Sequence, residues 1–265
     1  MQTFVVTGSA SGIGAATKAR LESDGHRVLG IDLNNADITA DLGTLSGRQA
    51  AVAAVGDRVD GSIDGFVAAA GVSSAPGMTP HRMLAINYFG AVELLEGLRP
   101  LLAAAPLPAA VLFSSNSTTC QSNWHTEVAE ACLAGDEEAA GALADANETP
   151  RGTQTYPASK AALAYYARTR SAEYISDGIR LNAVAPGVID TPMSRAASAD
   201  PVTAAATEKY IAAIPSARAG TADEVASAVT FLLGPDSTYV IGSVLFVDGG
   251  SDAAARGMDW PARKV

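Results

Sequence analysis

Short apolar runs alternate with longer helix-favouring stretches along almost the whole chain of 265 residues. The runs are rich in β-branched and aromatic residues, which favours strands, and they cover residues 3–6, 27–31, 65–69, 110–113, 179–184 and 244–247. The stretches between them favour helices at residues 13–24, 44–59, 79–104, 156–177 and 221–233. Strands that alternate with helices of this length predict βαβ units and a parallel sheet.

The predicted strands are continuous apolar runs, as expected where both faces of a sheet are covered. Right-handed crossovers place helices on both of those faces. No linker or internal repeat divides the chain, so we predict an α/β protein with one doubly wound Rossmann domain over residues 1–265. We expect about seven strands, and a short run before Ala40 is a further candidate strand.

Composition narrows the expected partners and location. Hydrophobic residues make up 48% of the chain, which is ample for a packed core, and the formal net charge of −10 argues against nucleic acid or an anionic membrane as partner. No apolar run is long enough to span a bilayer and no signal peptide is visible, so a cytoplasmic protein is expected. Cys120 and Cys132 fit no metal-ligand or redox spacing, which favours free thiols and no metal site.

Most of the excess negative charge lies between residues 124 and 150. This segment contains no lysine or arginine, and its acidic residues are Glu127, Glu130, Asp136, Glu137, Glu138, Asp145 and Glu148. Its alanine and glutamate content favours helix, with breaks expected at Gly135 and Gly141.

A glycine-rich turn follows the first predicted strand. Thr7-Gly8-Ser9-Ala10-Ser11-Gly12-Ile13-Gly14 lies between that strand and the first predicted helix, which is the context in which a glycine motif indicates dinucleotide binding. Glycine permits a tight turn and close approach of a ligand, and the N-terminus of the helix offers N–H groups to a pyrophosphate.

The second strand ends at Asp32, 18 residues after Gly14. A carboxylate at this place accepts hydrogen bonds from the adenosine ribose and repels a 2′-phosphate. No lysine or arginine lies at 33–35 or within the glycine turn, so NAD is favoured over NADP. The alternative is an ordinary turn aspartate.

Two further segments are candidates for the cofactor site. Asp41 either contacts the adenine amino group or caps the helix at 44–59. The small residues that end the third strand either let a cofactor lie against the backbone or serve tight packing. The predicted cofactor-binding residues in this half of the chain are Gly8, Ser11, Gly12, Ile13, Gly14, Asp32, Asp41, Leu42, Ala70 and Gly71.

Tyr156-Pro157-Ala158-Ser159-Lys160 opens a predicted helix and is the sharpest chemical signal. Residues four apart share a helix face, so Tyr156 and Lys160 can reach one cleft. An ammonium favours the phenolate and would make the tyrosine a usable acid or base. The alternative is an exposed tyrosine beside a surface lysine.

Taken in order, the glycine turn, Asn87, a serine after the fifth strand, Tyr156-x-x-x-Lys160 and Asn182-x-x-x-Pro186-Gly187 resemble the short-chain dehydrogenase/reductase family. The resemblance runs from Thr3 to Gly250. It implies that Tyr156 is the general acid or base, and that Lys160 binds the nicotinamide ribose and lowers the pKa of Tyr156.

The same resemblance implies roles for other residues. Ser115, with Ser114 ranked second, would hydrogen-bond the substrate oxygen. Asn87 would hold a proton-relay water, unless it is a helix-interior asparagine satisfied by backbone. The loop after the sixth strand would grip the carboxamide of the cofactor through Pro186, Gly187, Ile189 and Thr191, with Asp190 solvated.

The chain departs from the family pattern in one place. Ser115 and Tyr156 are 41 residues apart, far more than in most members, and the extra chain is the acidic segment at about 124–150. This insertion, with other motifs, resembles bacterial 3α-hydroxysteroid dehydrogenase/carbonyl reductases. It lies where many relatives pack helices into a dimer, so it either blocks that interface or is a solvated, mobile excursion.

These features predict an NAD-dependent oxidoreductase, a homodimer or homotetramer, that interconverts a secondary alcohol and a ketone. The region at about 191–217, with Met193, Tyr210, Ile211, Ile214 and Pro215, suits a hydrophobic substrate such as a steroid, although ordinary packing would use the same residues. The alternatives are a dehydrogenase of a smaller alicyclic or terpene alcohol and a non-catalytic dinucleotide-binding regulator. A serine hydrolase is excluded because Ala10 stands where a G-x-S-x-G motif needs serine.

Overall fold

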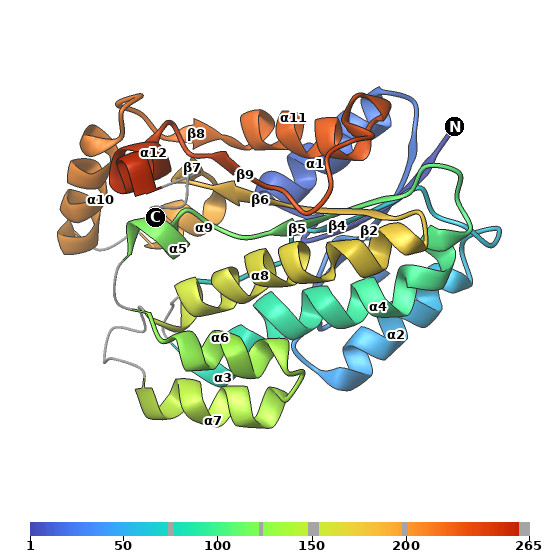
Figure 1. Cartoon of the computed structure of the whole chain (residues 1–265), viewed down its shortest axis with the longest axis horizontal. Helices are drawn as coiled ribbons and strands as arrows, with labels where there is room; N and C mark the ends of the chain where they lie inside the picture. Colours follow the sequence, from blue (N-terminus) through green and yellow to red (C-terminus); the bar gives the residue numbers. More distant parts are fainter. Residues whose placement is uncertain (74–76, 122–123, 148–153, 198–200, 260–265) are drawn as a thin grey trace.

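A seven-stranded parallel sheet lies between two layers of helices in the computed structural model, which describes residues 1–73, 77–121, 124–147, 154–197 and 201–259 (Figure 1). The strand order is β3-β2-β1-β4-β5-β6-β9. The strands are β1 (Thr3–Thr7), β2 (Arg27–Asp32), β3 (Ile38–Thr39), β4 (Gly65–Ala68), β5 (Ala109–Phe113), β6 (Arg180–Pro186) and β9 (Val244–Val247). The predicted α/β class, the parallel sheet and the helices on both faces are confirmed.

Burial explains why the central strands read as continuous apolar runs. Every residue of β4, β5 and β6 is buried, since helices cover both faces. One layer contains α2 (Leu45–Gly56), α4 (Gly90–Ala103) and α8 (Thr155–Ser176), and the other contains α1 (Gly12–Ser23) and α11 (Ala222–Leu233) (Figure 1). Each layer encloses its own cluster of buried apolar side chains against the sheet.

The helix predicted at 79–104 contains a π-helical turn. It begins as α3 (Pro80–Leu84), passes through the π-helical turn Ala85–Phe89 and continues as α4. Asn87 lies in the middle of this turn and is fully buried. Such turns often occur at functional sites, but apolar periodicity does not predict them.

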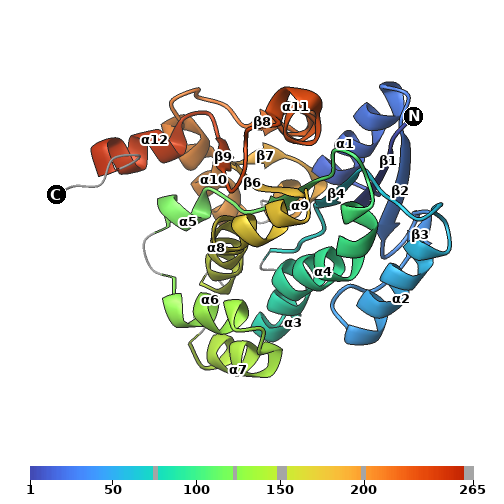
Figure 2. The same cartoon turned by 45° about the vertical axis from the view of Figure 1, so that its right-hand side comes forward.

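The insertion forms two packed helices, α6 (Thr126–Leu133) and α7 (Glu137–Asn147), and residues 148–150 lie outside the described part. Figure 1 and Figure 2 show them as an outer layer beyond α8 and α3. The buried side chains Val128 and Cys132 pack in the main core cluster, so the alternative of a solvated excursion is wrong for residues 124–147.

One of the two glycine breaks predicted for the insertion is confirmed. Gly135 lies between the helices with φ 78°, where glycine is favoured. The break predicted at Gly141 is wrong, because this glycine lies inside α7. A Cβ there would lie 2.3 Å from Nδ1 of His81, so the glycine makes room for a side chain on α3.

The remaining elements follow the C-terminal ends of the strands. They are α5 (Ser117–Cys120), β7 (Ile189–Asp190), α9 (Pro192–Ala197), α10 (Pro201–Ala213), β8 (Gly220–Thr221), α12 (Ser251–Arg256) and the 3₁₀ turns Pro235–Ser237 and Gly257–Asp259. The small sheet of β7 and β8 was not predicted, since two-residue strands leave no alternation to detect. No helix in the described parts of the chain is both long and apolar enough to cross a membrane.

Candidate active site

The turn between β1 and α1 has the geometry of a ligand cradle. Gly8 and Gly12 have φ angles of 68° and 56°, which favour glycine. A Cβ on Gly8 would lie 2.8 Å from the backbone of Ala70, and one on Gly14 would lie 2.1 Å from the carbonyl oxygen of Gly8. Ser11 at the N-cap of α1 makes no side-chain capping bond, so it leaves the first-turn N–H groups to another acceptor.

A cavity beside this turn is lined by every cofactor-binding residue predicted from the first half of the chain. The sheet brings them together because the turn, the end of β2 and the end of β4 lie at the carboxyl ends of neighbouring strands. Other residues of the wall include Ile86, Val72 and Thr191.

The Asp32 carboxylate lies at one end of this cavity. Its Oδ2 accepts a hydrogen bond from the Ala10 amide at 3.0 Å, which fixes it against the glycine turn. The Lys18 ammonium is bound to Asp37, at 2.6 Å. No lysine or arginine occurs among the described residues that line the cavity, so that end carries negative charge.

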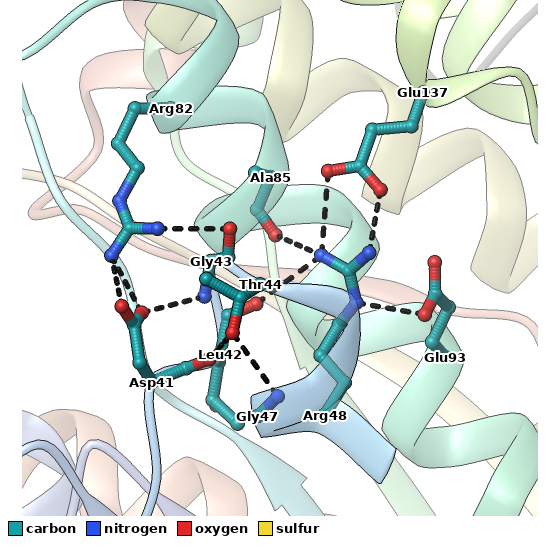
Figure 3. Close-up of polar contacts among 10 residues, drawn as sticks. All are labelled: Asp41, Leu42, Gly43, Thr44, Gly47, Arg48, Arg82, Ala85, Glu93 and Glu137. Carbon is teal, nitrogen blue, oxygen red and sulfur yellow. Dashed lines mark hydrogen bonds and ion pairs between the residues drawn. The ribbon is translucent and has the colours of Figure 1, made fainter.

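Asp41 does not cap the following helix, so that alternative is wrong. Thr44 caps α2 by accepting a hydrogen bond from the Gly47 amide at 3.1 Å. The Asp41 carboxylate lines the cavity and is held by Nη2 of Arg82, 2.6 Å from both oxygens (Figure 3). Hydrogen bonding to Arg82 and to the Gly43 amide holds the pKa of Asp41 below its usual value.

A second cavity, of about 430 Å³, is lined by the acid–base residues predicted at the start of α8. Tyr156 and Lys160 line it from the first two turns of the helix, and Ser115 lines it after β5. Nζ of Lys160 lies 5.6 Å from the centre of the Tyr156 ring and donates a hydrogen bond to the Phe113 carbonyl at 3.0 Å. The two cavities share Ile13, Gly71 and Thr191 in their walls, so they adjoin.

Burial has the largest effect on the pKa values of both Tyr156 and Lys160. It lowers the pKa of Lys160 to about 8 and raises the pKa of Tyr156, the latter opposed by a hydrogen bond with Ser115. The expected lowering of the Tyr156 pKa by Lys160 is therefore absent from this structure, because desolvation outweighs the favourable interactions of the phenolate.

The two serines after β5 face different partners. Ser114 is buried and its hydroxyl donates to the Lys160 carbonyl at 2.8 Å. Ser115 is the one that bonds to the Tyr156 side chain, and its Oγ also accepts from the Ser117 amide at 3.1 Å. This arrangement supports Ser115 over Ser114 as the serine that would hydrogen-bond the substrate oxygen.

Asn87 lies beside Lys160 and is bonded to backbone in another segment. Its Oδ1 accepts from the Val72 amide at 2.8 Å, and its Nδ2 donates to the Val72 carbonyl at 3.0 Å and to Ser159 at 3.3 Å. A Cβ on Gly71 would lie 3.3 Å from that Oδ1 and 3.4 Å from Nζ of Lys160. An amide oxygen has two lone pairs, so Oδ1 retains capacity to accept from a water.

The loop after β6 lines the second cavity through Pro186, Gly187, Ile189 and Thr191. Thr191 also caps α9, since its hydroxyl accepts from the Ser194 amide at 3.3 Å. Asp190 is exposed, as expected, and pairs with Arg195 at 3.0 Å.

Sequence reasoning missed part of the second cavity. Asn116 and Cys120 line it, and Nδ2 of Asn116 donates to the hydroxyl of Tyr210 on α10 at 3.4 Å. The polar run after β5 was the available signal, since ligands bind beyond the carboxyl ends of strands. Of the apolar residues expected to cover a substrate, Met193 and Tyr210 line the cavity, whereas Ile214 is buried elsewhere.

Comparisons with known proteins extend over almost the full chain. The family described as Enoyl-(Acyl carrier protein) reductase matches residues 141–252. The chain is 36% identical over 256 residues to the 3-alpha-hydroxysteroid dehydrogenase/carbonyl reductase of Comamonas testosteroni, covering 97% of this chain and 98% of that protein. It is 31% identical to the cis-4-hydroxycyclohexanecarboxylate dehydrogenase of Sinomonas cyclohexanicum, covering 94% and 96%.

A solved structure is similar over the same length. The crystal structure of the 3-alpha-hydroxysteroid dehydrogenase from Pseudomonas sp. B-0831 complexed with NADH matches with a TM-score of 0.90 and 43% identity, covering 97% of this chain and 99% of that chain. The similarity therefore includes both cavities and the insertion, rather than the glycine turn alone.

Proposed function

The chain belongs to the short-chain dehydrogenase/reductase family, and on that premise we propose that it is an NAD(H)-dependent oxidoreductase interconverting a secondary alcohol and a ketone. The ordered motifs predicted the family correctly. One observation supports this proposal most strongly. Tyr156, Lys160 and Ser115 line the same cavity, and that cavity adjoins the glycine-turn cavity.

The residues of the glycine-turn cavity fit a dinucleotide. Gly8 and Gly14 let the turn close tightly, since a Cβ on either would collide with backbone, and the α1 N-terminus would offer its first-turn N–H groups to a pyrophosphate. Asp32 would accept hydrogen bonds from the adenosine ribose, which favours NAD over NADP. Asp41 and Leu42 would contact adenine. When bound, the nicotinamide supplies or accepts the hydride.

Tyr156 would transfer the proton that ketone reduction requires in addition to the hydride. In ketone reduction its hydroxyl donates a proton to the developing alkoxide, and in alcohol oxidation the phenolate takes one back. The raised pKa of Tyr156 keeps its hydroxyl protonated, as ketone reduction requires. The nearby Lys160 ammonium would stabilise the phenolate that results and hydrogen-bond the nicotinamide ribose.

The other predicted residues would position the reactants. Ser115 would hydrogen-bond the substrate oxygen, since its side chain already bonds to Tyr156. Asn87 would hold a water beside Lys160 through the free lone pair of Oδ1. The loop with Ile189 and Thr191 would hold the carboxamide.

We propose a hydrophobic substrate of the 3α-hydroxysteroid or carbonyl type. Met193 and Tyr210 give the second cavity apolar walls, and two relatives bear hydroxysteroid dehydrogenase names. A smaller alicyclic alcohol is the alternative, because a further relative is named for a hydroxycyclohexanecarboxylate. A cytoplasmic location fits the free thiols of Cys120 and Cys132.

Replacing Tyr156 with Phe tests the proposal. The variant removes only the proton-transferring hydroxyl, so kcat should fall by more than about a hundredfold while the Kd for NADH changes little. Tyr165→Phe is the matched control, because Tyr165 lies exposed on the same helix and lines neither cavity. Full activity of Tyr156→Phe would refute the mechanism.

A further inference from the structure

The Asp41–Leu42 wall of the glycine-turn cavity is held by two arginines that do not line the cavity (Figure 3). Arg82 on α3 binds the Asp41 carboxylate at 2.6 Å and the Gly43 carbonyl at 2.9 Å. Arg48 on α2 donates from Nη1 to the Leu42 carbonyl at 3.4 Å. Both residues of the wall are therefore fixed from outside.

Arg48 is buried, at 2% exposure, and its charge is balanced by two carboxylates. Its Nε lies 2.7 Å from Oε2 of Glu93, and its Nη2 lies 2.5 Å from Oε2 of Glu137. A buried charge that loses a partner is strongly destabilised, so the position of Arg48 depends on both acids. Glu137 is the first residue of α7 and lies 89 residues from Arg48 in the sequence.

A second connection joins α7 to the same wall. The His81 ring packs against Gly141, and the His81 amide donates to Oδ1 of Asp145 at 3.4 Å. His81 directly precedes Arg82 on α3. The insertion is thus connected to Leu42 by way of Arg48, which Glu137 binds. It is connected to Asp41 by way of Arg82, whose neighbour His81 contacts α7.

We propose that α7 is a positioning element for the adenosine half of the cofactor site, acting through Arg48 and Arg82. This inference rests on the proposed function, because it assigns the Asp41–Leu42 wall to adenosine. Loss of the Glu137 charge should weaken binding of ligands that contain adenosine and spare ligands that contain only the nicotinamide half. By thermodynamic reciprocity, adenosine ligands should also stabilise α7.

Glu137→Gln tests the inference, with Glu138→Gln as the matched control, since Glu138 is its exposed neighbour and carries the same charge. Coupling between sites is typically worth at least fivefold, so the Kd for ADP-ribose and the KM for NADH should rise about five- to tenfold in Glu137→Gln. The KM for reduced nicotinamide mononucleotide and the kcat at saturating NADH should stay within about twofold of wild type. A purely structural role would not produce this split.

Glu93 still pairs with Arg48 in Glu137→Gln, so the variant is expected to fold, and a thermal melt checks it. If the variant does not fold, Asp145→Ala on α7 removes the exposed carboxylate that accepts from the His81 amide, and it should give a split in the same direction. An unchanged ADP-ribose Kd, or an equal loss for the mononucleotide, would overturn the inference. Failure of the proposed function is distinguishable in the wild-type protein, which would then either bind neither NADH nor ADP-ribose or bind NADH without turning over any ketone.

Discussion

The Lys160 ammonium is the charge most affected by burial at the proposed site. The side chain is 5% exposed, and desolvation lowers its pKa from 10.5 to about 8. Below pH 8 the lysine is charged in the folded and unfolded states, so the full desolvation penalty opposes folding. Between pH 8 and 10.5 the unfolded chain binds more protons than the folded chain, so this contribution to stability improves as pH rises.

Lys160→Met tests this at the residue scale in protein without cofactor. The variant removes the buried charge, so its Tm relative to wild type should be highest near pH 7 and should decline as pH rises through 8 toward 10.5. Loss of the hydrogen bond to Phe113 adds an offset that does not vary with pH. Thermal melts across this pH range measure the difference, and a difference that is flat with pH would show that Lys160 is not desolvated in the folded state.

Motif residues were predictable one by one, whereas their long-range partners were not. Tyr156, Lys160 and Ser115 are marked by spacing along the chain, and the structure brings them to one cavity. Arg48 and Arg82 carry no such mark, because their acidic partners lie 41 or more residues away and no local pattern pairs them. Their importance appears only when α2, α3 and α7 are packed together.

At the scale of elements, α7 shows why local propensity misleads. Its composition correctly predicts helix, but glycine destabilises helices by roughly 0.5–1 kcal/mol, so the same sequence wrongly predicts a break at Gly141. Glycine is nevertheless needed inside the helix, because the His81 ring occupies the space that a side chain at position 141 would fill. Apolar periodicity also does not predict the π-helical turn at Asn87, whose side chain bonds to the backbone of Val72 in another segment.

Gly141→Ala should therefore destabilise the protein, although alanine is the better helix former. The new Cβ would lie 2.3 Å from the His81 ring, and overpacking of this kind costs about 1–3 kcal/mol. Gly56→Ala is the matched control, because Gly56 ends α2 with nothing within 4 Å of a Cβ. Urea unfolding measures both, and a Gly141→Ala variant as stable as Gly56→Ala would contradict the packing described for α7.

At the scale of the molecule, the parallel sheet and the two helical layers followed from the alternation of strands and helices, whereas the strand order came only from the structure. The single domain over residues 1–265 stays a prediction, as does a homodimer or homotetramer. The insertion helix α6 packs on α8, and the resemblance to the family leads us to expect the subunit interface elsewhere on the molecule. In the described sheet, β9 is an edge strand with Leu245 exposed, which makes it a candidate for that interface.

The most direct test of the proposed activity is oxidation of NADH, followed optically, against 3-ketosteroids, monocyclic terpene ketones and simple aromatic ketones, with NADPH in parallel. We predict turnover of a hydrophobic ketone with NADH, and a kcat/KM with NADPH lower by about tenfold or more, because Asp32 repels a 2′-phosphate. Turnover of only the smaller ketones would keep the mechanism and replace the steroid assignment. Binding of NADH without turnover of any ketone would contradict the account and favour a dinucleotide-binding regulator.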